Sequence, residues 1–541
     1  MKRVVGWRMV SVVVLVTSFM VTVAQAQQPT VVLTLRGIEQ LLNDAEFIGH
    51  EVDQEGIKEA AESQIEGLTG GKGLAGIDQK KPLGAFWNAT AGGPPEMPVV
   101  FIPVSDADAL KGLLKELTPD FRDAKGDWSM TFNGTAVYGK VSGSYLFLSI
   151  TPLPAKLPDP TKFANSKYDL ALDVSIASIP EELKSTFLEA MENSGRQALE
   201  NGPPPASEAE RVGRDLGFDG TLSTVKSLVN DGDKLTLGFD VDAKTRLSTV
   251  DFGITGKANS ALAKAMTAYG KLQPLFAGIG SDTAPFRLAI SYPTTGITEQ
   301  MDAFFKGIRE TAEQEIDKDE RLSDDNDRAA AKGLAKRLFD IMQGTVKSGS
   351  MHSGLVLESG GGGKIRVIAA TKVANGDEAG KLVDDIVKLS KENPELGKIK
   401  LDAAKHSGAR IHEVTTDQSE DTEKYFGDEP AHLGFRADSL WMSIGGENLA
   451  ALKKALDQTA KPATRATVSP ISFQVKPAAL VLLMEKDDEG LIERAKAIAG
   501  KPGDKLILDI APVANGAKLR LEMGIDLLKL ADQEKDEDDS K

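Results

Sequence analysis

Cysteine is absent from this 541-residue chain. Its absence excludes disulfide bonds, zinc–thiolate sites, iron–sulfur clusters and thiol catalysis. It also excludes acylation at a lipoprotein cysteine. Aromatic residues are sparse, at 6%, whereas the hydrophobic content of 41% is ordinary for a globular protein. We therefore expect a fold that is held together by its hydrophobic core.

Long hydrophobic runs are absent except near the start of the chain. Residues 9–23 are mostly apolar, follow three basic residues and precede an Ala-Gln-Ala sequence at 24–26. This layout is typical of a secretory signal peptide. The alternative is an uncleaved membrane anchor, but a spanning helix needs about 20 apolar residues, and serines and threonines interrupt this run. We predict that residues 1–26 are a signal peptide and that cleavage releases a soluble periplasmic or extracellular protein without a membrane span.

Basic clusters are missing as well. The formal net charge is −16, with 80 acidic and 64 basic residues. A nucleic-acid-binding protein normally carries a basic footprint, so we expect no nucleic-acid partner. The acidic excess favours solubility. Residues 531–541 are mostly acidic, and such a like-charge run predicts a disordered tail.

The chain does contain a recurring pattern of two strands followed by a helix. In one copy, apolar residues alternate with small or polar residues over 235–241 and again over 250–254. Such alternation predicts antiparallel strands with one buried face and one solvated face. A helix is predicted at 261–269, because Asn259 and Ser260 can cap its first turn.

Four further copies of this pattern are predicted at irregular intervals. The irregular spacing argues against a solenoid and indicates duplication with different insertions. The copies have strand pairs at 83–88 and 99–104, 355–357 and 365–370, 433–435 and 440–444, and 506–510 and 519–523. The first pair is followed by leucines with the spacing of one helix face, Leu110, Leu113, Leu114 and Leu117.

Two helical hairpins are predicted as insertions. One covers residues 183–229, with a Gly-Pro-Pro-Pro tip at 202–205, and the other covers 301–341, with a charged tip at 317–327. The predicted fold class is therefore α+β: antiparallel sheets built from repeated β-hairpin–helix units, with two inserted helical hairpins.

The predicted division of the chain follows from clusters of Pro, Ser and Thr between these elements. It comprises a signal peptide (1–26), an N-terminal α+β domain (27–156), a second α+β unit with a helical hairpin (157–283), a third α+β unit with a helical hairpin (284–464), a C-terminal hairpin–helix unit (465–530) and the disordered acidic tail (531–541).

Two glycine clusters raise the question of phosphate binding. Residues 360–363 are all glycine and precede Lys364, but a P-loop needs Ser or Thr after the lysine and then a helix. Here Ile365 begins a predicted strand. Gly445 and Gly446 lie between a predicted strand and a helix, where backbone N–H groups can bind an anion. A third glycine and a ribose-binding acid are missing, so we interpret both clusters as turns.

Candidate metal ligands and catalytic groups are few, and the chain has only five histidines. His406, His412 and Glu413 could bind zinc, but strand neighbours 412 and 413 point to opposite faces. Residues 317–327 lack the central glycine and the alternating aspartates of a calcium loop, so a solvated hairpin tip is favoured. No G-x-S-x-G motif occurs. We predict no catalytic, cofactor-binding or metal-binding residue.

Several motifs resemble those of a group of bacterial exported proteins of unknown function. They are GLAGID at 73–78, KPLG at 81–84, VVFIPVSD at 99–106, YFG at 425–427, LGFRAD at 433–438 and GGE at 445–447. The resemblance spans most of the chain after the leader. Because these motifs form turns, strands and caps, it implies a shared fold and supplies no catalytic residue.

Three functions are compatible with these observations. The leading hypothesis is a non-enzymatic exported protein, a binding or scaffold module of the cell envelope, because structural units recur without convergent reactive residues. The second is a carrier of an apolar ligand or lipid, held between curved sheets and helical hairpins. The third is a hydrolase that uses paired carboxylates, whose separation depends on the fold. The expected partner is a protein or an apolar ligand in the cell envelope.

Overall fold

The computed structural model describes residues 29–91, 96–205, 208–295, 298–319, 322, 324–389, 398–415, 419–459, 469–485 and 487–531. The predicted signal peptide and nearly all of the predicted acidic tail lie outside these ranges. The protein is α+β, as predicted, with extensive antiparallel strand pairing. No helix within the described ranges is both long and apolar enough to cross a membrane.

The chain divides into two compact units. Unit 1 comprises Met1–Ser194 and Val225–Ala263, and unit 2 comprises Gly195–Thr224 and Lys264–Lys541. The four predicted α+β parts are a finer division that these units do not test, so they stay a prediction.

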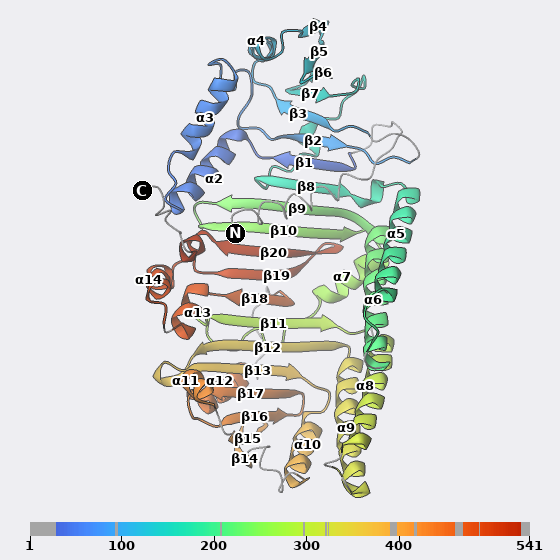
Figure 1. Ribbon diagram of the computed structural model, residues 1–541, viewed down its shortest axis with the longest axis vertical. Helices are drawn as coiled ribbons and strands as arrows, with labels where there is room; N and C mark the ends of the chain where they lie inside the picture. The colour runs from blue at the N-terminus through green and yellow to red at the C-terminus, as the bar shows by residue number, and fades with distance from the viewer. Residues whose placement is uncertain are drawn as a thin grey trace. The chain divides into compact units, whose positions relative to one another are not determined.

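The described strands of unit 1 pair antiparallel in one continuous order (Figure 1). In that order they are β4 (Arg122–Ala124), β5 (Asp127–Phe132), β6 (Thr135–Ser142), β7 (Tyr145–Ser149), β3 (Val99–Pro103), β2 (Leu83–Trp87), β1 (Val31–Leu35), β8 (Leu170–Ser175), β9 (Gly232–Asp242) and β10 (Leu247–Gly256). The turn between β5 and β6 is Asn133-Gly134. Both residues have positive φ, 49° and 79°, as a two-residue hairpin turn of this sequence requires.

Helices connect several of these strands. Helices α2 (Ile38–Glu51) and α3 (Ile57–Leu68) join β1 to β2, and α4 (Ala107–Leu117) joins β3 to β4. The helix predicted after residue 104 is confirmed by α4, which Asp106 caps by accepting from two backbone N–H groups. Helices α5 (Glu181–Glu200) and α6 (Glu208–Asp231) join β8 to β9 and belong partly to each unit. Helix α7 (Ala261–Gly270) follows β10.

Unit 1 has apolar packing on both faces of its strands. On one face, which we call the packed face of unit 1, Phe86, Phe101 and Phe147 form a cluster with Leu157 and Phe163 from the connection between β7 and β8. On the other face, Leu110 and Leu113 of α4 pack on Trp128 and Leu146. Helix α4 thus covers the end of the sheet near β5 and β7.

The described strands of unit 2 also pair antiparallel in one continuous order. In that order they are β14 (Lys398–His406), β15 (Ala409–Thr415), β16 (Ala431–Arg436), β17 (Ser439–Gly445), β13 (Ile365–Lys372), β12 (Ser350–Ser359), β11 (Phe286–Pro293), β18 (Ile471–Val475), β19 (Leu506–Val513) and β20 (Gly516–Gly524). The strand order is the same as in unit 1, with β11 in the place of β1, β12 in the place of β2, and so on.

The helices of unit 2 occupy the connections between these strands. Helices α8 (Thr298–Lys318) and α9 (Asp325–Lys347) join β11 to β12, and α10 (Gly376–Leu389) joins β13 to β14. Helix α11 (Glu420–Phe426) precedes β16, and α12 (Asn448–Thr459) follows β17. Helices α13 (Pro477–Met484) and α14 (Glu489–Ile498) join β18 to β19.

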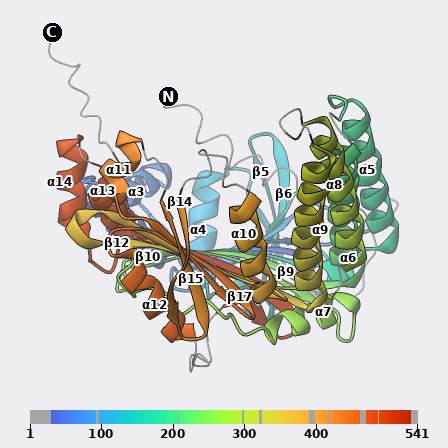
Figure 2. The same ribbon diagram turned by 90° about the horizontal axis from the view of Figure 1, so that it is seen from below.

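The main core of unit 2 lies on one face of its strands, which we call the packed face of unit 2. There Leu452 and Leu456 of α12 pack with Phe276, Ile368 and Trp441. Helix α10 packs on the other face through residues that contact Leu433, Phe435 and Leu440. Figure 2 shows α10 and α12 on opposite sides of the unit 2 strands.

Candidate functional site

The hairpin of β9 and β10 departs from the expected burial of its apolar side chains. Leu237 and Phe239 are each 37% exposed, and Phe252 is 40% exposed, whereas Asp251 on the opposite face is only 1% exposed. The predicted pattern of one buried and one solvated face is present, but these apolar residues lie on the more exposed face. The apolar side chains lie on an open face of the sheet.

The polar set is buried because the chain that precedes β8 lies over it. Tyr168 packs on Gly238, where a Cβ atom would lie 2.6 Å from the tyrosine ring. The Tyr168 hydroxyl donates to Asp251 Oδ2 at 2.7 Å. Asp173 accepts a hydrogen bond from Thr236 Oγ1 at 2.5 Å. Since these partners satisfy the polar side chains, their burial carries little cost.

The open face of unit 1 is apolar across seven neighbouring strands. The register places one residue of each strand in a row, and directly paired residues point to the same face. From β7 to β10 this row is Leu148, Val100, Ala85, Leu33, Leu172, Leu237 and Phe252. A second row, two residues along, is Leu83, Leu35, Leu170, Phe239 and Val250. We call these two rows the unit 1 apolar face.

Helix α4 covers only part of this face. Leu148, at the β7 end, packs in the cluster with α4, whereas Leu170, Leu237 and Phe252 remain between 37% and 40% exposed. A contiguous exposed apolar patch of this kind normally marks a binding site.

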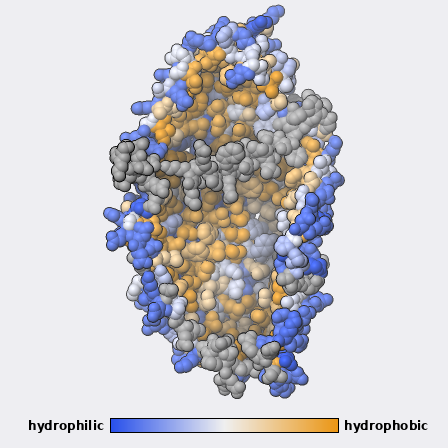
Figure 3. Space-filling view, viewed as in Figure 1, coloured by the Kyte–Doolittle hydropathy of each residue, from blue (hydrophilic) through white to orange (hydrophobic). Residues whose placement is uncertain are grey.

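Unit 2 has an apolar face at the equivalent strands. From β17 to β20 its row is Met442, Ala369, Leu355, Leu288, Phe473, Leu508 and Leu521. A second row is Leu357, Phe286, Val475, Leu506 and Met523. We call these two rows the unit 2 apolar face. Figure 3 shows apolar residues over the strands of each unit and hydrophilic residues over the neighbouring helices.

Methionine is prominent on this second face. Met442 is 39% exposed and Met523 is 36% exposed. Met351 and Tyr292, which pair with each other on the same face, are 40% and 44% exposed. Because methionine is flexible and polarizable, it adapts to ligands of irregular shape.

Neither apolar face contains a charged residue in its two rows. The charges of unit 1 gather elsewhere, for example directly after β1, where Arg36 pairs with Asp169 and Asp240 at 3.0 Å each. Burial raises the pKa of Asp169 and that of Asp44, and the Asp44 carboxylate raises the pKa of Asp169 further. The apolar faces themselves therefore offer dispersion and hydrophobic contact and no ionic partner.

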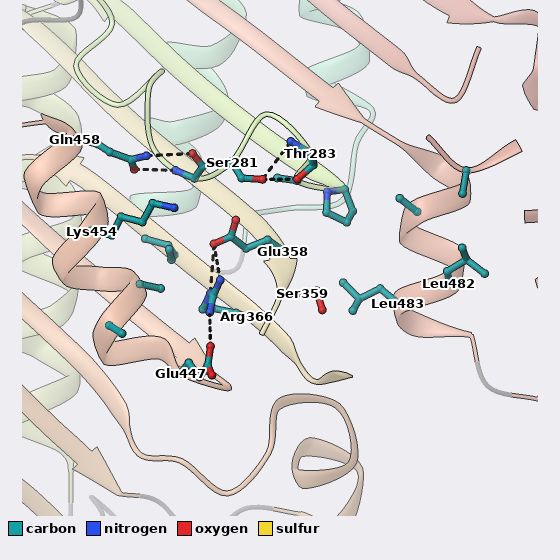
Figure 4. Close-up of a pocket in the computed structure, with 18 residues that line it drawn as sticks. Ser281, Thr283, Glu358, Ser359, Arg366, Glu447, Lys454, Gln458, Leu482 and Leu483 are labelled. Carbon is teal, nitrogen blue, oxygen red and sulfur yellow. Dashed lines mark hydrogen bonds and ion pairs between the residues drawn. The ribbon is translucent and has the colours of Figure 1, made fainter. Parts of the chain in front are cut away.

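A separate pocket lies on the packed face of unit 2 (Figure 4). It has a volume of about 630 Å³ and is lined by residues of α12, α13, β12 and β13. Arg366 Nη2 donates to Glu358 Oε1 at 2.9 Å, and Arg366 Nη1 lies 3.9 Å from Glu447 Oε2. The Gln458 side chain bonds the backbone of Gly280. Because most of its polar groups already satisfy one another, this pocket is a weaker candidate than the apolar faces.

The two glycine clusters are brought together by the fold. Residues 360–363 form the turn between β12 and β13, and Gly445-Gly446 lies between β17 and α12. A Cβ atom on Gly360 would lie 2.5 Å from the Gly446 carbonyl oxygen. Both clusters are turns, as interpreted, and their glycines allow this close approach of two backbones. The sequence could not show that they meet.

The residues considered for zinc do not converge. His406 Nε2 lies 2.9 Å from Asp457 Oδ1, while the fully buried His412 accepts from the Asp402 N–H through Nδ1 at 2.9 Å. Glu413 faces Lys400 at 3.7 Å. Across the described ranges, no group of three or more His, Asp or Glu is arranged to hold a metal.

The acidic stretch at 317–327 is described only in part, because Glu320, Arg321 and Ser323 lie outside the described residues. Asp324 caps α9, and Asp317 pairs with Lys332 at 2.6 Å. These aspartates therefore have partners within the helical hairpin.

Sequence reasoning found the alternation of apolar and polar residues in β9 and β10 but could not show which face is covered. The sequence did not show which residues cover the polar side chains of the hairpin, because Tyr168, which bonds Asp251, lies 83 residues before it.

Comparison with known proteins identifies no relative that could indicate the role of this site. No protein-family model, no curated protein and no solved structure matches the chain. The candidate site therefore rests on its geometry.

Proposed function

We propose that this protein binds the acyl chains of lipids on the apolar faces of its two units. The observation that carries the proposal is the unit 1 apolar face, whose first row has seven apolar residues. Four of the strands that form this face, β3, β8, β9 and β10, keep exposed apolar side chains on it. Covering such side chains removes apolar surface from water and stabilises a complex by about 25 cal/mol per Å².

The size of the face suits an acyl chain. Neighbouring strands lie about 4.8 Å apart, so β2, β1, β8, β9 and β10 together span about 19 Å. The hydrocarbon core of a bilayer is about 30 Å thick, which gives about 15 Å for the chain of one leaflet. One acyl chain laid across these strands would contact all of them.

The chemistry of the face favours an alkyl chain over a peptide strand. A peptide strand brings N–H and C=O groups that lose hydrogen bonds with water and need new partners. In unit 1, strands β7, β3, β2, β1, β8 and β9 are each hydrogen-bonded to a neighbouring strand on both sides. An alkyl chain has no such requirement.

The cellular setting remains part of the proposal. The predicted signal peptide and the resemblance to exported proteins support a location in the periplasm or outside the cell, where lipids of the envelope are available as ligands. The expectation of a binding module with an apolar ligand as partner fits this setting.

We also propose that the chain is built from repeated β-hairpin–helix units with inserted helical hairpins. Support comes from the element order: β2–β3 is followed by α4, β9–β10 by α7, β12–β13 by α10, and β16–β17 by α12. The equal strand order of the two units supports an origin by duplication.

A titration with cis-parinaric acid, a fluorescent fatty acid, tests the binding proposal. We expect saturable binding, with one site in each unit. Leu237→Lys should weaken the site in unit 1 at least tenfold, because a charge buried under an alkyl chain lacks a partner. Met442→Lys should do the same in unit 2.

Two variants serve as controls. Met342 lies on α9 and is 39% exposed, the same fraction as Met442, and Leu68 on α3 is 70% exposed. Met342→Lys and Leu68→Lys should leave binding unchanged. Equal losses in all four variants, or no saturable binding, would refute the proposal. A dimer that Leu237→Lys converts to monomers would assign the face to a second copy of the chain instead.

A further inference from the structure

A serine, a lysine and a histidine converge on the packed face of unit 2. Ser350 Oγ lies 3.0 Å from Lys372 Nζ and 3.0 Å from His352 Nε2. His352 Nδ1 lies 2.8 Å from Ser291 Oγ. Three adjacent strands, β11, β12 and β13, supply these residues, and Ser291 pairs directly with His352. The sheet register therefore fixes the cluster.

The cluster forms one complete chain of hydrogen bonds when Lys372 is neutral. In the structure Lys372 Nζ donates to Ser350 Oγ. With a neutral lysine this bond reverses, so that the Ser350 hydroxyl donates to Lys372 Nζ while His352 Nε2–H donates to Ser350 Oγ. Lys372 then donates to Ser348 Oγ at 3.0 Å and to the Ser350 carbonyl at 3.2 Å. In that neutral state each group has a partner, and the serine hydroxyl is directed at an amine that can accept its proton.

Burial favours the neutral forms that this chain requires. It lowers the pKa of Lys372, against an opposing effect of Asp438. It also lowers the pKa of His352 to about 4, with a contribution from the Lys372 charge. A depressed lysine pKa beside a hydroxyl is the arrangement by which a lysine activates a nucleophile.

The serine is accessible. Ser350 is partly exposed, while His352 is 6% and Ser291 1% exposed. Beside it, Gly349 has a φ of 88°, and a Cβ atom there would meet nothing closer than Thr295 Cγ2 at 3.9 Å. The backbone next to the serine is therefore uncrowded at Gly349.

We propose that Ser350 is a nucleophile for acyl transfer from small carboxylic esters, with Lys372 as its general base and His352 as a positioning residue. Ser350 Oγ bonds to the ester carbon while its proton moves to Lys372 Nζ. The carbon–oxygen bond to the leaving alcohol breaks, and Lys372 returns the proton to that alcohol. Water then attacks the acyl-serine, Lys372 takes one proton of the water and passes it to Ser350 Oγ, and the carboxylic acid leaves.

This activity is independent of acyl-chain binding. Ser350 and His352 lie on the packed face of unit 2, whereas the unit 2 apolar face is the opposite side of the same strands. The chemistry also differs from the carboxylate-based hydrolase that the sequence suggested as an alternative, because no carboxylate takes part in the cluster.

Labelling of the whole protein with a biotinylated fluorophosphonate, followed by peptide mapping, tests the proposal. We expect covalent label on Ser350 and an initial burst with p-nitrophenyl acetate. Lys372→Met and Lys372→Arg should each reduce the labelling rate at least a hundredfold. Arginine keeps the positive charge but cannot accept the proton, so its failure separates a general base from a simple cation.

Further variants separate positioning from folding. Ser353 lies on the same strand but on the opposite face, so Ser353→Ala should label like the wild type. His352→Gln keeps a side-chain N–H donor and should retain labelling within about tenfold, whereas His352→Phe should lose it. Label on another serine, or no label on folded wild-type protein, would overturn the proposal even if a variant fails to fold.

Discussion

Units 1 and 2 place their strands in the same order but fill equivalent positions with different side chains. On the apolar faces, Leu33 corresponds to Leu288, Val100 to Ala369 and Leu148 to Met442. All of these remain apolar although their volumes differ. The comparison indicates that the hydrophobic character of the face is maintained while its detailed shape is free to vary, as expected of a surface that binds flexible chains.

The packed faces show a different kind of substitution. In unit 1, Phe101 pairs with Phe147, whereas in unit 2 the equivalent pair is Ala370 with Trp441. A small residue beside a larger one replaces two residues of similar size, because close-packed cores keep their total volume. Packing therefore constrains this face more tightly than the open one.

Truncation of these aromatic residues should give the largest effect. Phe101 is fully buried and Trp441 is 2% exposed. We expect Phe101→Ala and Trp441→Ala each to lower the free energy of unfolding by about 3–5 kcal/mol. Urea unfolding measures the loss. If Ala370→Phe, which adds volume beside Trp441, stabilised unit 2, the two cores would not be matched in volume as we argue.

Acidification should destabilise unit 2 through His352. Its pKa is about 4 in the folded protein, whereas the ordinary pKa of a histidine is 6.5, so the unfolded chain binds the proton more readily. Stability should therefore fall as the pH drops from about 6.5 to about 4, by roughly 3 kcal/mol. Urea unfolding of wild type and His352→Gln across this range measures the difference. A wild-type curve parallel to that of the variant would contradict the assignment.

In unit 1, the buried Asp44 should change stability with pH in the opposite direction to His352. The pKa of Asp44 is raised, chiefly by burial, so its ionised form is disfavoured in the folded state. Asp44→Asn should stabilise unit 1 at neutral pH, and this gain should fade as the pH falls toward the ordinary range of an aspartate. Urea unfolding of the variant and the wild type at both pH values measures the gain.

Methionine oxidation should distinguish the two apolar faces. Mild peroxide converts exposed methionine to the polar sulfoxide, and Met351, Met442 and Met523 lie on the unit 2 side only. We expect binding of cis-parinaric acid by unit 2 to weaken about tenfold. In the Leu237→Lys protein the unit 1 site is weakened, so binding reports on unit 2. In the Met442→Lys protein the unit 2 site is weakened, so binding reports on unit 1, and the affinity of unit 1 should not change on oxidation. Equal losses in both would show that the two faces are not separate sites.

Helix caps should give the smallest effect, with nearly equal values in the two units. Asp106 accepts from the N–H groups of Asp108 and Ala109 at the start of α4, and Asn375 accepts from the Glu378 N–H at the start of α10. Asp106→Ala and Asn375→Ala should each cost about 1 kcal/mol of unfolding free energy. Thermal unfolding measures both. A difference of more than twofold would mean that these helices contribute unequally to their units.

Local features of the fold were predictable from the sequence. The Asn133-Gly134 turn depends on two adjacent residues, both of which take positive φ. Helix α4 is confirmed because the leucine spacing that predicts it lies within one short segment. By contrast, the sequence pattern did not predict helices α2 and α3. The buried residues of α2 are Asp44, Gly49 and Glu51, and α3 has none, so neither helix buries an apolar stripe.

Features that depend on distant residues were not predictable. The order of strands brings β1 between β2 and β8, which are separated in the chain by residues 88–169. Ser350 and Lys372 meet only after β12 pairs with β13. The orientation of β9 and β10 depends on Tyr168, which reaches Asp251 from another part of the chain. A pattern within one segment carries no information about such contacts.

The strands β4 and β14, which lie at equivalent ends of the strand orders of units 1 and 2, have a consequence for aggregation. A protein with large exposed apolar faces is at risk of adding strands from other molecules at its sheet edges. In unit 1, β4 is only three residues long, and all three residues are exposed. In unit 2, β14 carries three lysines, and its register is interrupted near Asp402, where φ is 52°. Short length, positive charge and an irregular backbone make both strands poor templates, so the faces can stay open without leading to fibres.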